Sequence, residues 1–257
     1  MADGVLVLSK AAAVLDALAD NRELTPNELA KVLDEPRGTV YRILGTLEDL
    51  GYVEPGARPR SYQLGMVLVA LGNAALKRFG DVRRAALPSL ELLSEQTRQT
   101  VFLLVPRGFE AICIDRIDGE FVQVMILSPG GSLPLHAGAA TRALLAFMDR
   151  EVWDDFLAAG PLERFSDRTP TTRRALFAEL EHVRAQGYAV SDEDVIPGIA
   201  SIGAPIFDYT GRVCAALSAS GPRPIVLDPE NSFIQYTCRG AEDVSRRLGH
   251  TASLSPV

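Results

Sequence analysis

The chain has 257 residues, with 26 basic and 33 acidic side chains and a net charge of −7 at neutral pH. Because 47% of the residues are hydrophobic and 23% are charged, the composition is that of a globular protein and excludes disordered, collagenous and disulfide-rich secreted chains. No apolar stretch approaches the ~20 residues of a membrane-spanning helix. The N-terminal residues lack the basic region and the cleavage site of a signal peptide. We therefore expect a cytoplasmic protein with no membrane partner.

Two helical patterns open the chain. The first is a stripe of apolar residues spaced three and four apart, which we expect to face a core: Leu8, Ala11, Ala12, Leu15 and Leu18. The second begins at Thr25-Pro26-Asn27-Glu28, where Thr at the N-cap, Pro at the first helical position and Glu at the third form a capping box. This short helix is expected to end near Leu33, and Pro36 is expected to open the next helix.

The third helical pattern, Arg37 to Leu50, has two different faces. Its apolar residues fall within one arc that we expect to be buried: Val40, Ile43, Leu44, Leu47 and Leu50. The opposite face carries Gly38, Tyr41 and Gly45. Two short strands then follow, beginning at Tyr52-Val53 and Ser61, and a basic turn rich in Pro and Gly joins them. This order of elements predicts a winged helix-turn-helix.

A winged helix-turn-helix places its third helix in the major groove of double-stranded DNA. Residues 1–62 carry seven basic and ten acidic side chains, so overall charge does not support DNA binding and individual arginines must carry it. Small residues allow close approach of the helix, while longer donors reach bases or phosphates. The predicted DNA-binding residues are Arg37, Gly38, Thr39, Tyr41 and Arg42 on the helix, and Arg58 and Arg60 on the wing. The alternative is an ordinary solvated surface.

The segment from Leu64 to Phe79 is again helical in pattern, but apolar residues occur on two of its sides. One side carries Val67 and Leu71, and the other carries Met66 and Val69. Because a helix that is apolar on two sides must be buried on both, we expect a dimer contact here. The alternative is a helix covered by the second domain of its own chain.

The rest of the chain predicts an antiparallel α+β domain, because strands occur in pairs with helices around them. The expected strands are 101–105, 111–116, 121–127, 199–207 and 213–220. The expected helices are 82–97, which Pro88 interrupts, and 141–148, 151–158, 172–186 and 229–248.

Three segments of this domain are candidates for a small-molecule pocket. The stretch from Leu133 to Thr141 ends where a helix begins, and unpaired amides at a helix N-terminus bind carboxylate or phosphate. Ile199 and Ser201 share one face of a strand. Two hydroxyls, Ser218 and Ser220, lie on one face of an otherwise apolar strand, where they either face solvent or meet a polar ligand. Apolar neighbours favour a small aliphatic or aromatic carboxylate.

Several stretches resemble IclR-type (isocitrate lyase regulator) transcription factors, in order and in spacing, over about residues 6 to 249. They are LSKAAAVLDAL, LAKVLDEPRGTVYRILGTLEDLGYVE, SYQLG, GGSLPLHAGAATRALLA, GYAVSDEDVIPGIASIGAPIFD and GRVCAALSASGP. One departure is the turn from Leu33 to Gly38, where the family usually reads Thr-Gly-Leu-Pro-Arg-Ser. Asp34 can still take the left-handed conformation of that glycine.

The resemblance implies a winged helix in residues 1–64, a linker helix in 65–80, a GAF-like effector-binding and oligomerisation domain in 81–250, and a tail in 251–257. It implies a regulator whose operator binding changes with a bound metabolite. The partners are then a palindromic DNA operator and further copies of the chain, as a dimer or a dimer of dimers. Repression and activation both stay open.

The family's effector sites, carried onto this sequence, imply contacts at the loop-to-helix segment, the acidic stretch and the strand serines. Together with the apolar neighbours, the predicted effector-binding residues are Met125, Leu133, Ala139, Ala140, Ser191, Asp192, Ile199, Ser201, Ser218 and Ser220. One alternative is a constitutive DNA-binding regulator whose C-terminal domain only oligomerises.

Another alternative is an enzyme, and the sequence offers little for it. Cys113, Cys214 and Cys238 are widely spaced and form no C-x-x-C pair, so we expect neither a disulfide nor a metal site. Known catalytic motifs are absent. His136 and Cys214 resemble a nucleophilic pair only if the fold joins them. The sequence therefore predicts neither a catalytic residue nor a cofactor.

Overall fold

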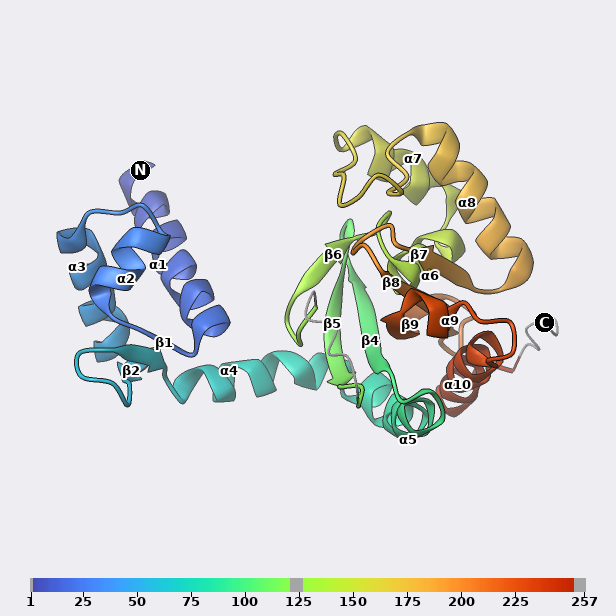
Figure 1. Cartoon of the computed structure of the whole chain (residues 1–257), viewed down its shortest axis with the longest axis horizontal. Helices are drawn as coiled ribbons and strands as arrows, with labels where there is room; N and C mark the ends of the chain where they lie inside the picture. Colours follow the sequence, from blue (N-terminus) through green and yellow to red (C-terminus); the bar gives the residue numbers. More distant parts are fainter. Residues whose placement is uncertain (1, 121–126, 252–257) are drawn as a thin grey trace. The chain divides into compact units, whose positions relative to one another are not determined.

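The computed structural model describes residues 2–120 and 127–251. The chain folds as two compact units, Met1–Arg78 and Phe79–Val257, whose elements are drawn in Figure 1. The boundary falls inside the segment 65–80 that was predicted as a linker. Within the described ranges, no helix has both the length and the apolar character needed to cross a bilayer.

The N-terminal unit is a helical bundle with a small antiparallel sheet. The strand order is β1-β3-β2, and β2 and β3 form the hairpin of the wing. Its elements are α1 (Ala2–Asn21), β1 (Glu23–Leu24), α2 (Pro26–Val32), α3 (Arg37–Asp49), β2 (Val53–Pro55), β3 (Tyr62–Leu64), α4 (Val67–Leu76) and η1 (Lys77–Phe79). The predicted winged helix-turn-helix is therefore confirmed, while β1 was not predicted because two residues carry no periodicity.

The turn between α2 and α3 follows from local chemistry. The backbone N–H of Thr25 donates to Glu28 Oε2 at 2.7 Å, and the N–H of Glu28 donates to Thr25 Oγ1 at 3.3 Å, so the predicted capping box is present. Asp34 has a φ of +51°, the left-handed conformation expected of it. Pro36 is the N-cap of α3. The sequence thus sets the angle at which α3 leaves the turn.

Two predicted apolar stripes were partly wrong. In α3, Val40 and Leu44 are buried as expected, but Leu50 is 57% exposed because the helix ends at Asp49. In α1, Leu8 is 72% exposed and Ala12 is also exposed. The residues that α1 buries are Val14, Ala17 and Leu18. In a helix rich in alanine and leucine, three-and-four spacing fits more than one stripe, so the pattern alone did not select the buried one.

The C-terminal unit is a six-stranded antiparallel sheet of order β6-β5-β4-β9-β8-β7 with helices on both faces. The strands are β4 (Thr100–Arg107), β5 (Glu110–Ile117), β6 (Ser132–Pro134), β7 (Ala189–Asp192), β8 (Ile199–Phe207) and β9 (Val213–Pro222). The helices are α5 (Gly80–Thr97), α6 (Ala139–Phe147), α7 (Arg150–Ala158), α8 (Arg173–Gln186), α9 (Arg223–Val226) and α10 (Phe233–Arg247). The predicted antiparallel α+β class is confirmed.

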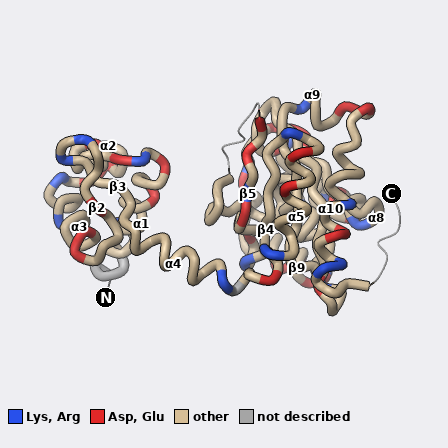
Figure 2. The backbone as a smooth tube through the Cα atoms, turned by 90° about the horizontal axis from the view of Figure 1, so that it is seen from below, with Lys and Arg blue, Asp and Glu red and all other residues tan. Residues whose placement is uncertain are grey.

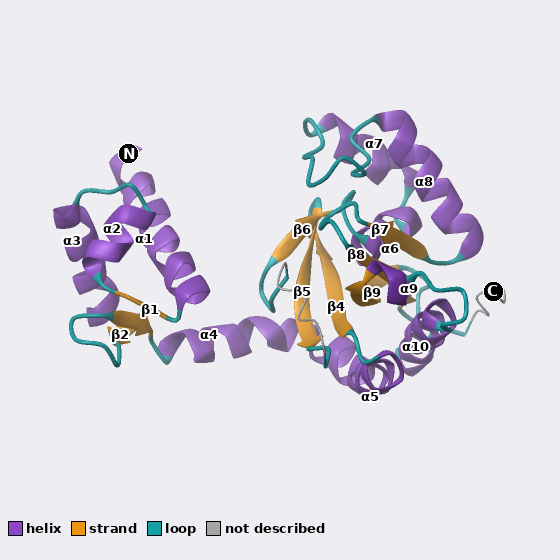
Figure 3. Cartoon of the chain, viewed as in Figure 1, coloured by secondary structure: helices purple, strands orange, loops and turns teal. Residues whose placement is uncertain are grey.

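The two faces of this sheet have different neighbours. Helices α5 and α10 pack on one face, while α6 packs on the other and is covered in turn by α8 (Figure 3). Leu217 of β9 points toward α10, since a Cβ built on Gly240 would lie 2.9 Å from its Cδ2. Its neighbour Ser218 therefore points toward α6.

Helix α5 runs without interruption through Pro88, so the predicted break there was wrong. The remaining differences concern short elements and helix ends. Strands β6 and β7 were not predicted, because three or four residues between loops give no usable alternation. Helix α10 begins at Phe233, four residues later than expected. Of the predicted strand 121–127, all but Leu127 lies outside the described residues.

Candidate functional site

The outer face of α3 is open. The predicted DNA-binding residues of this helix all reach its surface: Arg37, Gly38, Thr39, Tyr41 and Arg42. Tyr41 is 53% exposed, and a Cβ built on Gly38 or Gly45 would have nothing within 4 Å. This face is therefore shallow apart from the long side chains of Arg37, Tyr41 and Arg42, which suits the floor of a major groove.

A groove separates α3 from the wing. Tyr41 of α3, Pro26 of α2 and residues 55–62 of the wing line it, and its empty volume of about 990 Å³ includes open solvent. Arg58 and Arg60 both lie on this groove. Both acidic and basic residues are distributed over the N-terminal unit (Figure 2).

The two wing arginines have different surroundings. Arg58 Nε donates to Glu23 Oε1 at 2.9 Å and Nη2 to the Glu23 carbonyl at 2.8 Å, and the guanidinium also pairs with Glu28. The backbone N–H of Arg58 is the main cause that holds the pKa of Glu23 below its ordinary value. Arg58 stays a predicted DNA contact, and among the described residues its charge already ties the wing to β1 and α2.

Arg37, Arg42 and Arg60 differ from Arg58. Among the residues that the structure describes, none forms an ion pair or a side-chain hydrogen bond with these three guanidinium groups. All three are exposed. An exposed guanidinium without an intramolecular partner loses little when it moves to a phosphate or a base edge. The DNA-binding prediction thus rests on these three arginines and Tyr41.

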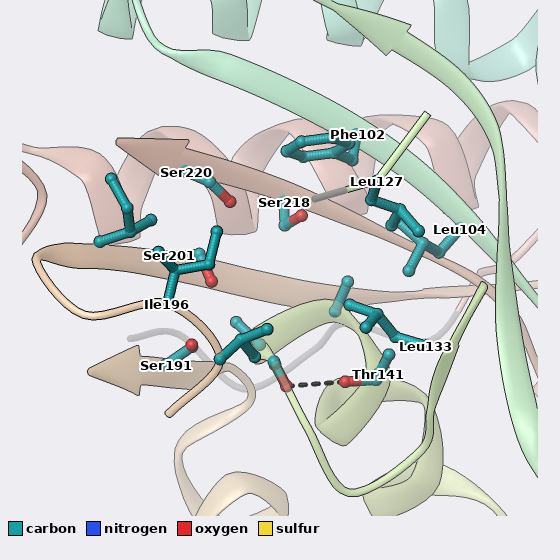
Figure 4. A pocket seen from close by; sticks show the side chains of 15 residues that line it. Phe102, Leu104, Leu127, Leu133, Thr141, Ser191, Ile196, Ser201, Ser218 and Ser220 are labelled. Atoms are coloured by element: carbon teal, nitrogen blue, oxygen red, sulfur yellow. Dashed lines mark hydrogen bonds between the residues drawn. The ribbon is translucent and has the colours of Figure 1, made fainter. Parts of the chain in front are cut away.

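A pocket lies between the sheet and α6 of the C-terminal unit (Figure 4). Its empty volume of about 500 Å³ includes open solvent. Eight of the ten predicted effector residues line it: Leu133, Ala139, Ala140, Ser191, Ile199, Ser201, Ser218 and Ser220. The structure thus brings together segments that are up to 87 positions apart, from Leu133 to Ser220.

The serines form a polar row on the pocket face of the sheet (Figure 4). Strand register pairs Ser191 of β7 with Ser201 of β8, and Ser201 with Ser220 of β9. Ser201, Ser218 and Ser220 are 8%, 4% and 7% exposed, so they do not face bulk solvent. No described residue forms a hydrogen bond with their hydroxyls. These hydroxyls line the pocket and are available to a polar ligand.

The first turn of α6 supplies amide donors to the same pocket. Its N-cap is Gly138, which has a φ of +93° and no side-chain cap. The Gly138 N–H is taken by Asp194 Oδ2 at 3.1 Å, while no described residue accepts from the N–H of Ala139 or Ala140. Gly203 allows this arrangement, because a Cβ there would lie 2.5 Å from the Ala139–Ala140 peptide. Such a helix N-terminus favours a carboxylate.

Two predicted effector residues are not part of this pocket as described. Met125 lies outside the described residues. Asp192 does not line the pocket, because alternation along β7 turns it away from the face that carries Ser191. It accepts from Arg223 Nη2 at 3.0 Å and from Arg168 Nη1 at 2.7 Å. Arg223 is the main cause that lowers its pKa, so Asp192 belongs to a surface ion-pair cluster.

Sequence reasoning missed four apolar residues of the pocket wall, namely Phe102, Leu104, Val195 and Ile196. The run from Val101 to Val105 is apolar at every position, so alternation could not show which residues face the pocket. Phe102 lies on the pocket face of the sheet because the strand register pairs it with Ser218.

Comparison with known proteins agrees with both units. Residues 7–56 match the IclR helix-turn-helix domain, and residues 74–246 match the C-terminal domain of the bacterial transcriptional regulator IclR. The chain belongs to the IclR family. The HTH-type transcriptional regulator BhcR of Paracoccus denitrificans is 35% identical over 219 residues, which are 85% of this chain and 78% of that protein.

Solved structures of IclR-family proteins also resemble the whole chain. The crystal structure of the Thermotoga maritima IclR superposes with a TM-score of 0.79 at 30% identity, covering 96% of this chain and 100% of that one. An IclR homologue from Microbacterium hydrocarbonoxydans in complex with 4-hydroxybenzoate gives a TM-score of 0.76 at 26% identity, covering 94% and 98%. The chain is thus a helix-turn-helix transcription regulator and not an enzyme.

The environment of the cysteines agrees with this IclR-family assignment. Burial raises the pKa of Cys113, Cys214 and Cys238 to about 12, which disfavours the nucleophilic thiolate. Cys214 contacts the carbonyl of Ile206, while His136 is 2.8 Å from the carbonyl of Glu163. The two side chains thus have separate partners, and the suggested nucleophilic pair does not form.

Gly203→Ala tests the packing of α6 in this IclR-family pocket. Because the new Cβ would overlap backbone atoms of α6, we expect the helix to shift and the free energy of unfolding to fall by about 1–3 kcal/mol. Chemical denaturation measures the change in stability. Gly80→Ala is the control, because nothing lies within 4 Å of a Cβ at that position. Equal stability of the two variants would contradict the close packing.

Arg58→Ala and Arg60→Ala separate the two roles of the wing. Arg58→Ala removes the contacts with Glu23 and Glu28, so we expect a lower melting temperature of the N-terminal unit and little change in the salt dependence of DNA binding. Arg60→Ala should leave the melting temperature unchanged and reduce the salt slope of DNA affinity by about 1. Thermal unfolding and binding titrations at several salt concentrations measure these effects. The reverse pattern would show that Arg58 is the phosphate contact.

Proposed function

We propose that this IclR-family regulator senses a small carboxylate in the C-terminal pocket and that the bound acid changes its affinity for a DNA operator. The observation that carries the proposal is the meeting of two unpaired donor sets in one cavity. The amides of Ala139 and Ala140 come from α6, and the hydroxyls of Ser201, Ser218 and Ser220 come from the sheet. The 4-hydroxybenzoate bound by the Microbacterium hydrocarbonoxydans homologue supports an acid as the ligand.

The lining indicates how the acid is oriented. A carboxylate binds at the first turn of α6, where free N–H groups and the helix dipole favour negative charge. The serine hydroxyls then bind polar groups farther along the ligand. Leu127, Leu133 and Phe102 form an apolar wall, which accepts an aliphatic or aromatic body. No charged side chain lines the described pocket, so the amides and hydroxyls select the ligand.

The active form is a homo-oligomer, a dimer or a dimer of dimers, on a palindromic operator in the cytoplasm, where the chromosome lies. Helix α4 supports this part of the proposal because it has no buried residue. Met66 and Val69 are 69% and 53% exposed on one side, and Val67 and Leu71 are 41% and 49% exposed on the other. A second copy buries this apolar surface and sets the spacing of two recognition helices.

The acid acts by shifting the equilibrium between two arrangements of the subunits. Binding stabilises one arrangement of the subunits, and segment 65–80 transmits this arrangement to the spacing of the two DNA-binding units. Because both recognition helices must fit half-sites about one helical turn apart, a modest change in spacing alters operator affinity.

Arg42→Ala tests the DNA-binding face. We expect operator affinity to fall by about 1–3 kcal/mol, because an unpartnered donor on the outer face of α3 is lost, while the oligomeric state stays the same. Gel-shift titration on DNA selected from the genome by the wild-type protein, together with analytical ultracentrifugation, measures both. Arg84→Ala in α5 is the charge-matched control and should leave affinity unchanged. Unchanged binding by Arg42→Ala would contradict the assigned face.

A panel of small carboxylates tests the sensor function. Thermal unfolding of the full-length protein with aliphatic and aromatic acids, 4-hydroxybenzoate among them, should give at least one acid that raises the melting temperature. At 100 times its Kd, such an acid stabilises the protein by about 2.7 kcal/mol. The methyl ester is the control and should have no effect, because it lacks the charge that α6 binds. A panel without any shift would favour a constitutive regulator whose C-terminal domain only oligomerises.

A further inference from the structure

A buried carboxylate lies directly behind the pocket. Asp194 follows β7, and its side chain is 4% exposed. Its Oδ2 accepts from the N–H of Gly138 at 3.1 Å and from the guanidinium of Arg142, while its Oδ1 accepts from the hydroxyl of Ser191. Each of these three groups is a hydrogen-bond donor, so both oxygens of Asp194 act as acceptors.

This arrangement fixes the hydrogen-bonding direction of Ser191. A serine hydroxyl has one proton and two lone pairs, and the proton of Ser191 is used on Asp194. Ser191 Oγ therefore presents only lone pairs to the pocket that it lines. The hydroxyl proton of Thr141 is also used within the protein, because it is shared between the carbonyls of Ala137 and Gly138. Ser201, Ser218 and Ser220 keep their protons free.

The position of Ser191 relates it to one part of the ligand. Ser191 and the Gly138 amide are bonded to opposite oxygens of the same carboxylate. Ser191 Oγ therefore lies beside the first turn of α6, where the ligand carboxylate is proposed to bind. With the ligand carboxylate on the first turn of α6, as in the proposed function, the group that would meet Ser191 is the substituent on the carbon next to the carboxylate. A hydroxyl there can donate to Ser191, whereas a carbonyl oxygen would face its lone pairs without a proton between them.

We propose that Asp194 is a positioning residue that makes the pocket select 2-hydroxy acids over 2-oxo acids of the same carbon skeleton. This inference rests on the proposed acid-sensing function and adds the class of acid. Asp194 does not touch the ligand, and it acts by holding the Ser191 proton away from the pocket. The expected preference of the wild-type protein is about tenfold or more, the effect of one unmade hydrogen bond at a buried site.

Asp194→Asn reverses the direction of Ser191 without changing the shape of the site. The two donors Gly138 and Arg142 keep the amide oxygen at the position of Oδ2, which places the amide nitrogen against Ser191. That nitrogen donates to Ser191 Oγ, so the serine proton becomes free to point into the pocket. The variant should therefore lose the preference for the hydroxy acid or prefer the oxo acid.

The experiment compares matched acid pairs on the full-length protein by isothermal titration calorimetry. Lactate with pyruvate and mandelate with benzoylformate serve as aliphatic and aromatic probes, with Kd measured for each acid on wild type and on Asp194→Asn. A hydroxy-acid preference in the wild type that falls or reverses in Asp194→Asn supports the inference. Equal binding of both acids by the wild type, or an unchanged ratio in Asp194→Asn, would overturn it.

Two further variants keep the test decisive if Asp194→Asn does not fold. Ser191→Ala should bring the hydroxy-to-oxo affinity ratio to about one, whereas a merely structural role of this serine would leave the ratio unchanged. Ser218→Ala should weaken both acids of a pair equally, because its free hydroxyl can donate or accept. If no acid of either class binds to the wild type, the proposed sensing function fails, and the inference fails with it. Binding of both classes without preference contradicts the inference alone.

Discussion

The C-terminal unit depends on one buried contact, that of Arg142 with Asp194. Their side chains are 3% and 4% exposed, and a charge at such a depth is costly unless it is paired and hydrogen-bonded. Arg142 meets this condition by also donating to the carbonyls of Val190 and His136. One side chain therefore joins α6, β7 and the segment before α6. Because these three parts form the base of the pocket, the pair fixes its geometry.

The same contact leaves a helix N-terminus incomplete. Thr25 caps α2 and Thr172 caps α8 with their side chains, but Gly138 has no side chain to cap α6, and Asp194 takes a single amide. The amides of Ala139, Ala140 and Thr141 then have no acceptor among the described residues and remain for a bound group. Helices α2 and α8 thus have side-chain caps at their N-termini, whereas α6 has none where it borders the pocket. An uncapped helix N-terminus of this kind is expected at a functional site.

The sequence could predict what depends on local chemistry. The capping box at Thr25 and the hydroxyl pair Ser218 and Ser220 were recognisable from neighbouring residues alone. The sequence could not predict features that depend on contacts between residues far apart in the chain, such as strand register and ion pairs. Asp192 was assigned to the pocket because the family resemblance implied contacts along the acidic stretch. Neighbouring residues of a strand point to opposite faces, and β7 was too short to show from the sequence which of them faces the pocket. The ion pairs of Arg58 likewise involve Glu23, 35 positions away in the chain, which no local pattern indicates.

The two units use charge in opposite ways. On α3 and the wing, arginines such as Arg42 stay exposed and unpaired among the described residues, so their binding energy is available to DNA. In the C-terminal unit the buried Arg142, at the base of the pocket, is paired with Asp194. The acid that we propose as the ligand would therefore meet oriented amides and hydroxyls and not a free cation, which favours discrimination by hydrogen-bonding direction over simple attraction of anions. Such a site distinguishes acids of equal charge, which is what a sensor of one metabolite requires.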